Sequence, residues 1–114
     1  MDERIEKWLV DIKTAIEEIE LFIKNIDIST IEAYQNELVV KRAIERELEI
    51  IGEAMNRILK NNPSFLDSIS ESKNIIGLRN RLIHGYDNIS DEIILSILLK
   101  HIPNLKNQIN SLLQ

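Results

Sequence analysis

Residues 5–26 read IEKWLVDIKTAIEEIELFIKNI, and their apolar side chains recur at steps of three and four positions. This spacing places the apolar side chains in one stripe along an α-helix, with acids and lysines on the opposite face. Trp8 belongs to this stripe and is predicted to have no role in binding. We therefore predict one long amphipathic helix, whose stripe consists of Ile5, Trp8, Leu9, Ile12, Ile16, Ile19, Phe22, Ile23 and Ile26.

A second helix is predicted downstream of the first. Ser29 and Glu32 have the spacing of a capping box, with Ser29 at the N-cap, so the chain can restart as a helix there. An apolar stripe then runs through residues 38–59, and Pro63 stops any continuation of the helix. Residues 64–72 are rich in serine and are expected to hold a short helix and a turn.

Two more helices complete the predicted pattern. A third helix is expected over about residues 74–84, with Gly85 as its C-terminal stop. Ser90 is followed by two acids and has the features of an N-cap for a fourth helix, because acids in the first turn favour the helix dipole. Pro103 lies inside the apolar pattern of this helix, so we expect a kink or a break near Lys100.

The composition favours an all-α fold class. The chain has 114 residues, of which 44% are hydrophobic and 29% are charged, with only three glycines and two prolines. These values are typical of one globular domain without the many turns that a β-sandwich or barrel needs. We predict a single helical domain over residues 1–114, folded as an antiparallel four- to five-helix up-and-down bundle whose last helix is kinked near Pro103.

Several classes of protein are disfavoured by the same composition. The chain has no cysteine, which argues against disulfides and thiolate metal sites, and its two histidines are too few for a histidine-rich metal site. Most acids lie on solvated helical faces, so we expect neither a bound metal nor a cofactor. No apolar run is long enough to span a membrane, and the acidic start at residues 1–3 is unlike a signal peptide. We therefore expect a cytoplasmic protein with no membrane partner.

The net charge of −5 argues against a protein that coats nucleic acid with its whole surface, but the charge is uneven. Residues 1–53 carry 14 acids and 7 bases, whereas residues 54–114 carry 5 acids and 7 bases. Lys73 and Arg81 lie within residues 72–86, a segment without acids, and are candidates for binding RNA. The alternative is that these bases belong to an ordinary solvated face.

Residues 79–86, which read RNRLIHGY, concentrate the side chains that can carry chemistry. The imidazole of His84 can take and return a proton near neutral pH, and the guanidinium of Arg79 holds a fixed charge suited to phosphate oxygens. Asn80 lies four positions before His84 on the predicted helix and can orient its ring. Arg79 and His84 are five positions apart, or about 140° around an ideal helix, so one helix does not place them on a common face.

These residue types suit cleavage of RNA by its own 2′-hydroxyl. A base deprotonates the hydroxyl, a cation stabilises the pentavalent phosphorane, and an acid protonates the leaving oxygen, with no metal required. The alternative interpretation is a histidine that caps the helix end next to surface arginines, because single histidines near helix C-termini are commonly structural. The residue types alone leave both interpretations open.

Three blocks of the sequence resemble the HepT-like toxins of the HEPN superfamily. Arg79, His84 and Tyr86 resemble the Arg-x4-His-x-Tyr motif of that family. Residues 42–54, which read RAIERELEIIGEA, resemble its other characteristic helix, and residues 102–109 resemble its closing helix. The resemblance covers nearly the whole chain and identifies it as a HepT-like helical domain.

The resemblance implies a homodimer in which two motifs face each other and build one composite, metal-independent ribonuclease site. Arg79 of one chain would then complement His84 of the other, which removes the problem of their angular offset. The resemblance also implies a type VII-like toxin–antitoxin pair, in which a minimal nucleotidyltransferase antitoxin silences the toxin by transferring AMP from ATP to the motif tyrosine, here Tyr86. Two alternatives are a catalytically weak module that binds the nucleotidyltransferase and a Tyr86 that only packs over the helix end.

Asn80 and Glu53 are assigned supporting roles at this predicted site. Glu53 can orient Arg79 or Asn80, although a plain surface carboxylate is an equal alternative. Gly52 costs about 1 kcal/mol relative to alanine inside a helix, and close packing of helices near the site is the interpretation that we favour for it. Arg46 and the glutamates around it have the spacing of a solvated ion-pair ladder.

Overall fold

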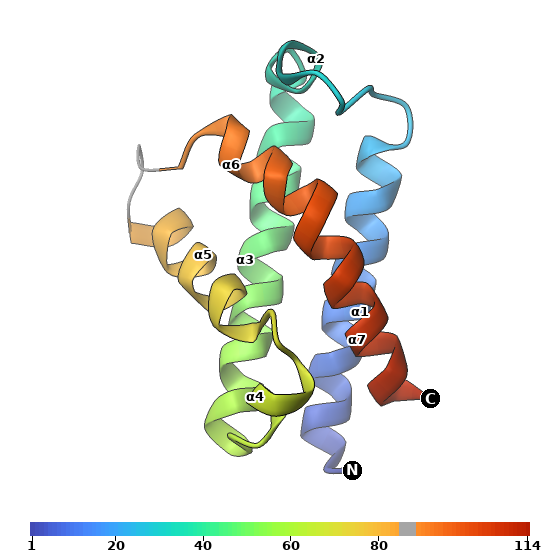
Figure 1. The fold of residues 1–114 in the computed structure, drawn as a ribbon, viewed down its shortest axis with the longest axis vertical. Helices are drawn as coiled ribbons and strands as arrows, with labels where there is room; N and C mark the ends of the chain where they lie inside the picture. The colour runs from blue at the N-terminus through green and yellow to red at the C-terminus, as the bar shows by residue number, and fades with distance from the viewer. Residues whose placement is uncertain (85–88) are drawn as a thin grey trace.

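The computed structural model describes residues 1–84 and 89–114, which fold into helices joined by short connections (Figure 1). The long helices are α1 (Glu3–Ile23), α3 (Leu38–Asn61), α5 (Ser72–His84) and α7 (Ile102–Leu113). The short elements are α2 (Ile31–Gln35), α4 (Phe65–Ser68), α6 (Asp91–Ser96) and the π-helical turn η1 (Ile97–His101). The described ranges contain no strand, which confirms the predicted all-α fold class. In these ranges the helices also lack the combined length and apolar character that a membrane span requires.

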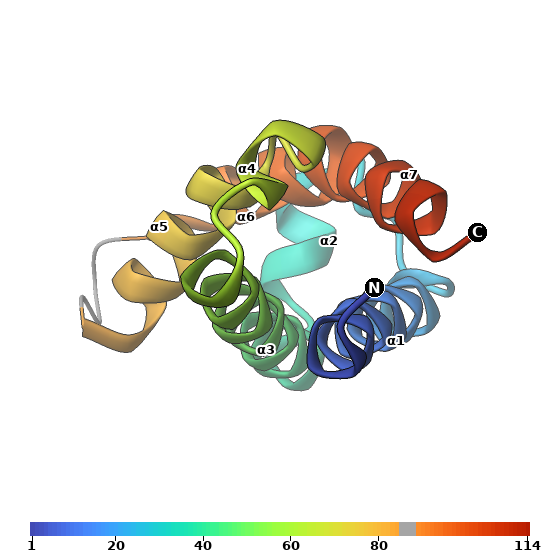
Figure 2. The same cartoon turned by 90° about the horizontal axis from the view of Figure 1, so that it is seen from below.

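The long helices pack around one apolar core. α1 and α3 run antiparallel, and α3 contacts α5 while α1 contacts α7 (Figures 1 and 2). The short α2 crosses one end of the bundle and buries Tyr34 there (Figure 1). Fully buried side chains of the core include Leu9, Ile12, Ile16, Ile19, Ile44, Leu48, Ile51, Met55, Ile58 and Ile75.

α1 is the predicted amphipathic helix, but it ends before the apolar pattern does. Its N-terminus is capped by Asp2, whose carboxylate accepts hydrogen bonds from the backbone N–H groups of Arg4 and Ile5. The sequence pattern predicts a stripe that continues through Phe22 to position 26, whereas the helix ends at Ile23 and Phe22 is 36% exposed. That part of the prediction is wrong because the chain turns away there toward α2.

The second predicted helix begins differently from the expectation. Thr30 is the N-cap of α2, and its hydroxyl accepts a hydrogen bond from the backbone N–H of Ala33 at 3.3 Å. Ser29, the predicted cap, instead donates its hydroxyl and its backbone N–H to the carboxylate of Asp27. Because Asp27 engages Ser29, the next hydroxyl in the chain caps the helix. The chain also breaks at residues 36–37, which separate α2 from α3.

The later boundaries agree with the predictions. α3 ends two residues before Pro63, and α4 is the expected short helix of the serine-rich segment. Ser90 caps α6, because its hydroxyl accepts a hydrogen bond from the backbone N–H of Ile93 at 3.2 Å. The expected break in the last helix takes the form of η1, and Pro103 follows in the first turn of α7, where a missing N–H is tolerated. Gly85, the expected stop of α5, lies outside the described residues.

A polar cluster ties the start of α5 to the last helix of the bundle. Glu71 is buried, and one of its carboxylate oxygens accepts a hydrogen bond from Asn104 Nδ2 at 3.0 Å. Its other oxygen lies 2.9 Å from His101 Nδ1. A buried carboxylate needs such partners to offset the loss of water. The cluster therefore holds the N-terminal end of α5, the helix that carries the predicted motif.

Glu47 of α3 is a second buried carboxyl group, and its surroundings are different. It is 6% exposed, and its Oε2 has no hydrogen-bond partner among the described residues. Burial raises the pKa of Glu47 to about 7. Glu18 in α1 acts in the same direction, through a side-chain hydrogen bond with Glu47 and through its negative charge. Arg46 lowers the pKa, but its effect is smaller. The folded protein therefore holds a proton on Glu47 at pH values where the unfolded chain releases it.

We expect Glu47→Gln to stabilise the protein at about pH 8 and to change its stability little at about pH 4. The pKa of Glu47 is about 7 in the folded state and near 4.5 in the unfolded state, so the free energy of unfolding falls as the pH rises through this window. A neutral glutamine avoids this loss, and we expect a gain of about 1–3 kcal/mol at the higher pH. Thermal unfolding followed by circular dichroism measures it. A gain of the same size at both pH values would contradict the raised pKa.

Candidate active site

The site begins with a close approach between α3 and α5 at Gly52. A Cβ atom at this position would overlap Cβ of Arg79, and it would lie 2.8 Å from Cγ of Arg79 and 3.1 Å from the carbonyl oxygen of Ile75. The missing side chain therefore lets the stem of Arg79 lie directly on α3. This contact confirms the interpretation of Gly52 as a residue of close helix packing.

Arg79 is held by polar partners from two helices. Its Nη2 donates to Glu53 Oε2 at 2.5 Å, and its Nη1 donates to Asn80 Oδ1 at 2.9 Å. Arg57 also approaches Glu53, with 3.4 Å between Nη2 and Oε1. The side chain of Arg79 is 22% exposed, so its charge is screened less than that of a surface arginine. The structure thus brings Arg79, Glu53 and Asn80 together around one guanidinium group.

His84 lies apart from this contact. It is the last residue of α5, and it is exposed. Within the described ranges, no hydrogen bond joins His84 to Arg79 or to Asn80, and the amide oxygen of Asn80 binds Arg79 instead. α5 is helical from Arg79 to His84, so their offset of about 140° is retained within one chain. Tyr86, the residue predicted to be modified, lies outside the described residues.

The two bases predicted to contact RNA are also on α5. Lys73 lies in its first turn and Arg81 in its last turn, and both residues are exposed. They are eight positions apart, which corresponds to about 12 Å along an ideal helix. As far as the structure describes the chain, no group of three or more His, Cys, Asp or Glu side chains is arranged to hold a metal ion.

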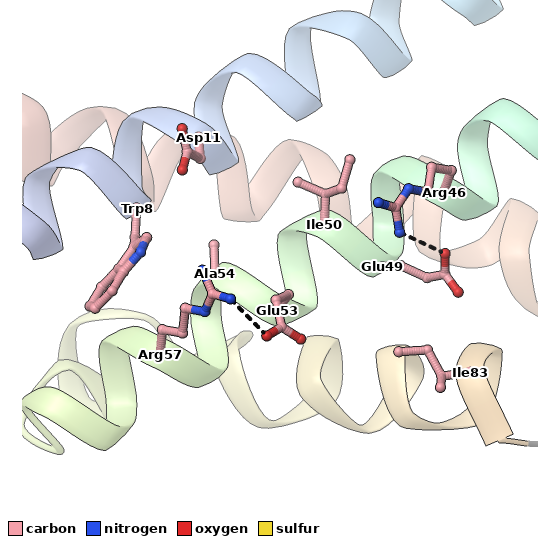
Figure 3. Close-up of a pocket in the computed structure, with 9 residues that line it drawn as sticks. All are labelled: Trp8, Asp11, Arg46, Glu49, Ile50, Glu53, Ala54, Arg57 and Ile83. Atoms are coloured by element: carbon pink, nitrogen blue, oxygen red, sulfur yellow. Dashed lines mark ion pairs between the residues drawn. The ribbon is translucent and has the colours of Figure 1, made fainter.

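A groove of about 310 Å³ crosses the surface of α3 at Glu53, the partner of Arg79 (Figure 3). α1 forms one side of this groove and α5 the other. The predicted ladder on α3 is present here as an ion pair of 3.5 Å between Arg46 and Glu49. The sequence did not predict the groove, because its two sides come from helices far apart in the chain. The groove is lined by Trp8, Asp11, Arg46, Glu49, Ile50, Glu53, Ala54, Arg57 and Ile83.

The fold and this arrangement define a class: an all-α bundle that carries an Arg-x4-His motif on a helix packed closely against a second, glycine-containing helix. Residues 12–112 match the family described as "Ribonuclease HepT-like". The chain belongs to this family, which confirms the resemblance seen in the sequence.

Two relatives match the chain over most of their length. The chain is 36% identical over 101 residues to "Putative RNase TTE0752" from Caldanaerobacter subterraneus subsp. tengcongensis, and the match covers 87% of this chain and 88% of that protein. It is 31% identical over 107 residues to "Putative RNase MJ1380" from Methanocaldococcus jannaschii, with 92% and 93% covered. No solved structure matches the chain.

We expect Gly52→Ala to destabilise the protein by about 1–3 kcal/mol, because the new methyl group overlaps the stem of Arg79. Gly77→Ala is the matched control within the other helix of this pair. A Cβ atom at Gly77 meets no atom within 4 Å, so this variant should gain up to about 1 kcal/mol from helix propensity alone. Urea unfolding of both variants measures the difference. Equal effects would contradict the close packing at Gly52.

Proposed function

We propose that this chain is a metal-independent endoribonuclease whose catalytic residues are Arg79 and His84. The observation that carries the proposal is the guanidinium of Arg79, held by Glu53 in a chain of the ribonuclease HepT-like family. An exposed imidazole at the end of the same helix supplies a proton carrier. The names of the relatives, which include the word RNase, agree with this activity.

The proposed reaction is transesterification by the RNA itself. His84 takes the proton of the 2′-hydroxyl, and the resulting oxygen attacks the adjacent phosphorus. The bond from phosphorus to the 5′-oxygen breaks, and a proton returned by His84 neutralises this leaving oxygen. Arg79 stabilises the charge that develops on the phosphorane. Glu53 and Asn80 act through Arg79 as positioning residues. The products are a 2′,3′-cyclic phosphate and a 5′-hydroxyl.

A homodimer completes this site. Arg79 and His84 are about 140° apart around α5, so a single chain does not direct both toward one phosphate. In a two-fold dimer the same surface is used by both copies, and residues of α5 can therefore meet across the axis. We infer that Arg79 of one protomer and His84 of its partner act on the same phosphate.

The RNA strand continues from this site along α5. Lys73 and Arg81 are exposed on this helix and suit contacts to phosphates on either side of the cleaved one. The net charge of −5 disfavours binding over the whole surface, so the contact is confined to the region around α5.

Regulation is proposed to act through Tyr86. A minimal nucleotidyltransferase antitoxin would transfer AMP from ATP to its phenol, releasing pyrophosphate. The AMP adds negative charge and bulk two residues from His84, where an RNA phosphate has to bind. The chain is thus the toxin of a type VII-like pair. The second candidate function is a catalytically weak module that binds this nucleotidyltransferase, and the acidic net charge favours it.

His84→Ala and Arg79→Ala should each lower RNA cleavage at least about a hundredfold, because each removes a group that acts in the transition state. Cleavage by the wild type should persist in EDTA and leave 2′,3′-cyclic ends. Incubation of the purified protein with total RNA, followed by analysis of the product ends, measures both effects. Lys60→Ala, at the far end of α3, is the control. Undiminished cleavage by His84→Ala would contradict its role, and no cleavage by the wild type would favour the binding module.

A mixture of the two inactive variants tests the composite site. A dimer of one Arg79→Ala chain and one His84→Ala chain retains one complete site if the two residues act from different protomers. It retains none if they act from the same protomer. We therefore expect partial recovery of cleavage after subunit exchange. No recovery, or a monomeric mass in light scattering at micromolar concentration, would contradict the dimer.

Tyr86→Phe should still cleave RNA but should escape inhibition by the nucleotidyltransferase and ATP, because it lacks the hydroxyl that accepts AMP. Co-expression of the wild type with a minimal nucleotidyltransferase, followed by mass spectrometry, should show AMP on Tyr86. Equal inhibition of the wild type and Tyr86→Phe would show that the partner inhibits by binding alone.

A further inference from the structure

One carboxylate of the proposed site is shared by two arginines. Glu53 Oε2 accepts a hydrogen bond from Arg79 Nη2 at 2.5 Å, and Glu53 Oε1 lies 3.4 Å from Arg57 Nη2. Arg57 has no part in the reaction described above. We propose that Arg57 balances the charge of Glu53 and thereby keeps the site positively charged for a phosphate of RNA. This inference rests on the proposed ribonuclease function and adds a functional residue to it.

The contact with Glu53 positions Arg79 but also neutralises it. The carboxylate of Glu53 and the amide oxygen of Asn80, at 2.5 and 2.9 Å, hold the guanidinium of Arg79 in place. A carboxylate carries one negative charge, so Arg79 and Glu53 taken together are neutral. A neutral pair attracts a phosphate much less than one guanidinium does, because the potentials of its two charges oppose each other. A phosphate site at Arg79 therefore needs a further positive charge.

Arg57 supplies this charge from the same helix as Glu53. It lies four positions after Glu53 on α3, and a glutamate followed by a base at this spacing forms a favourable pair on one helical face. Figure 3 shows the side chain of Arg57 extended along α3, with its guanidinium directed at the carboxylate of Glu53. Two guanidiniums and one carboxylate leave one positive charge in the cluster. That charge matches the single negative charge of a phosphodiester.

The exposure of the three side chains fits this division of roles. Arg79 is the most enclosed, with 22% of its side chain exposed, whereas Glu53 is 39% and Arg57 is 56% exposed. Arg79 is thus the arginine held in a fixed position. Arg57 is open to water, which screens its charge in part, so we expect a moderate effect on binding. Its exposure also means that its replacement should leave the fold intact.

The other charged residues of the neighbouring groove on α3 cancel in pairs. Arg46 pairs with Glu49 at 3.5 Å, and Asp11 pairs with Lys7 at 2.9 Å. Each of these pairs consists of one acid and one base, so neither adds net charge to this part of the surface. Within the described ranges, the positive excess of the region therefore lies at Glu53, where one acid is shared by two bases.

This charge balance predicts a characteristic order of RNA affinities. Arg57→Gln leaves a neutral pair of Arg79 and Glu53 and should weaken binding about fivefold, the upper range for an exposed ion pair. Glu53→Gln leaves two positive charges and should bind at least as tightly as the wild type. The double variant keeps one positive charge, on Arg79, so its affinity should return to about that of the wild type. Arg57→Lys retains the charge and should also bind like the wild type.

The binding probe is a fluorescent pool of short single-stranded RNAs of random sequence, with 2′-O-methyl groups that prevent cleavage. Fluorescence anisotropy gives its Kd, and the same pool with free 2′-hydroxyls gives KM and kcat. Arg57→Gln should raise KM and lower kcat, because the phosphorane carries more negative charge than the phosphate. The double variant should bind like the wild type but cleave at least about tenfold more slowly, because Glu53 no longer holds Arg79 in position.

Arg42→Gln is the matched control. Arg42 is an exposed arginine of the same helix, paired with Glu45 at 4.0 Å, and it precedes Gly52, where Arg79 packs on α3, by ten residues. Its replacement removes the same charge from the chain as Arg57→Gln does. Because this charge is remote from Arg79, the variant should bind and cleave RNA like the wild type. Circular dichroism shows whether each variant is folded.

Three outcomes would overturn the inference while leaving the ribonuclease intact, provided that the wild type cleaves RNA. Wild-type affinity in Arg57→Gln would show an ordinary surface ion pair. A double variant as weak as Arg57→Gln would show that Arg57 contacts RNA directly and not through Glu53. Equal weakening in Arg42→Gln would show an effect of total charge. Conversely, the expected order of affinities without any cleavage would support the role of Arg57 in binding and overturn the ribonuclease.

Discussion

The contact between the backbone of Gly52 and the stem of Arg79 sets the geometry on which the rest of the site depends. Because Gly52 has no side chain, α5 lies directly on α3, and the guanidinium reaches Glu53 one residue further along. The same approach brings α5 to the edge of the groove on α3. A wider spacing between the two helices would separate the arginine from its carboxylate and would widen the groove.

Two carboxyl groups of α3, those of Glu47 and Glu53, lie in contrasting surroundings. Glu53 faces α5 and forms ion pairs with Arg79 and Arg57. Glu47 faces Glu18 of α1, and its burial favours the protonated form. Neither group adds much net stability, because removing a charge from water offsets what its partners return. Glu53 therefore presents an ion pair toward α5, whereas Glu47 presents a carboxyl group that favours its neutral form toward α1.

The sequence predicts the features that depend on local spacing, and it fails where two distant segments meet. The apolar stripes and Pro63 predict the long helices because periodicity and backbone chemistry act within a few residues. The exchange of Ser29 for Thr30 as a cap depends on Asp27 and could not be decided from the capping-box spacing. The residues of the motif are readable from their spacing and chemistry. The groove is not, because α1 supplies one side of it and α5 the other.

The ion pair between Arg79 and Glu53 has a consequence for how binding responds to ionic strength. When a cationic side chain binds a phosphate of a nucleic acid, cations condensed around the nucleic acid are released, and this release makes binding depend on salt. The counter-ion of Arg79 is instead a side chain of the same molecule, at 2.5 Å, and it stays with the protein when a phosphate arrives. A phosphate at Arg79 therefore has to compete with Glu53 directly. A polymer held by additional contacts competes with this carboxylate better than a free anion does, because those contacts raise the local concentration of its phosphates.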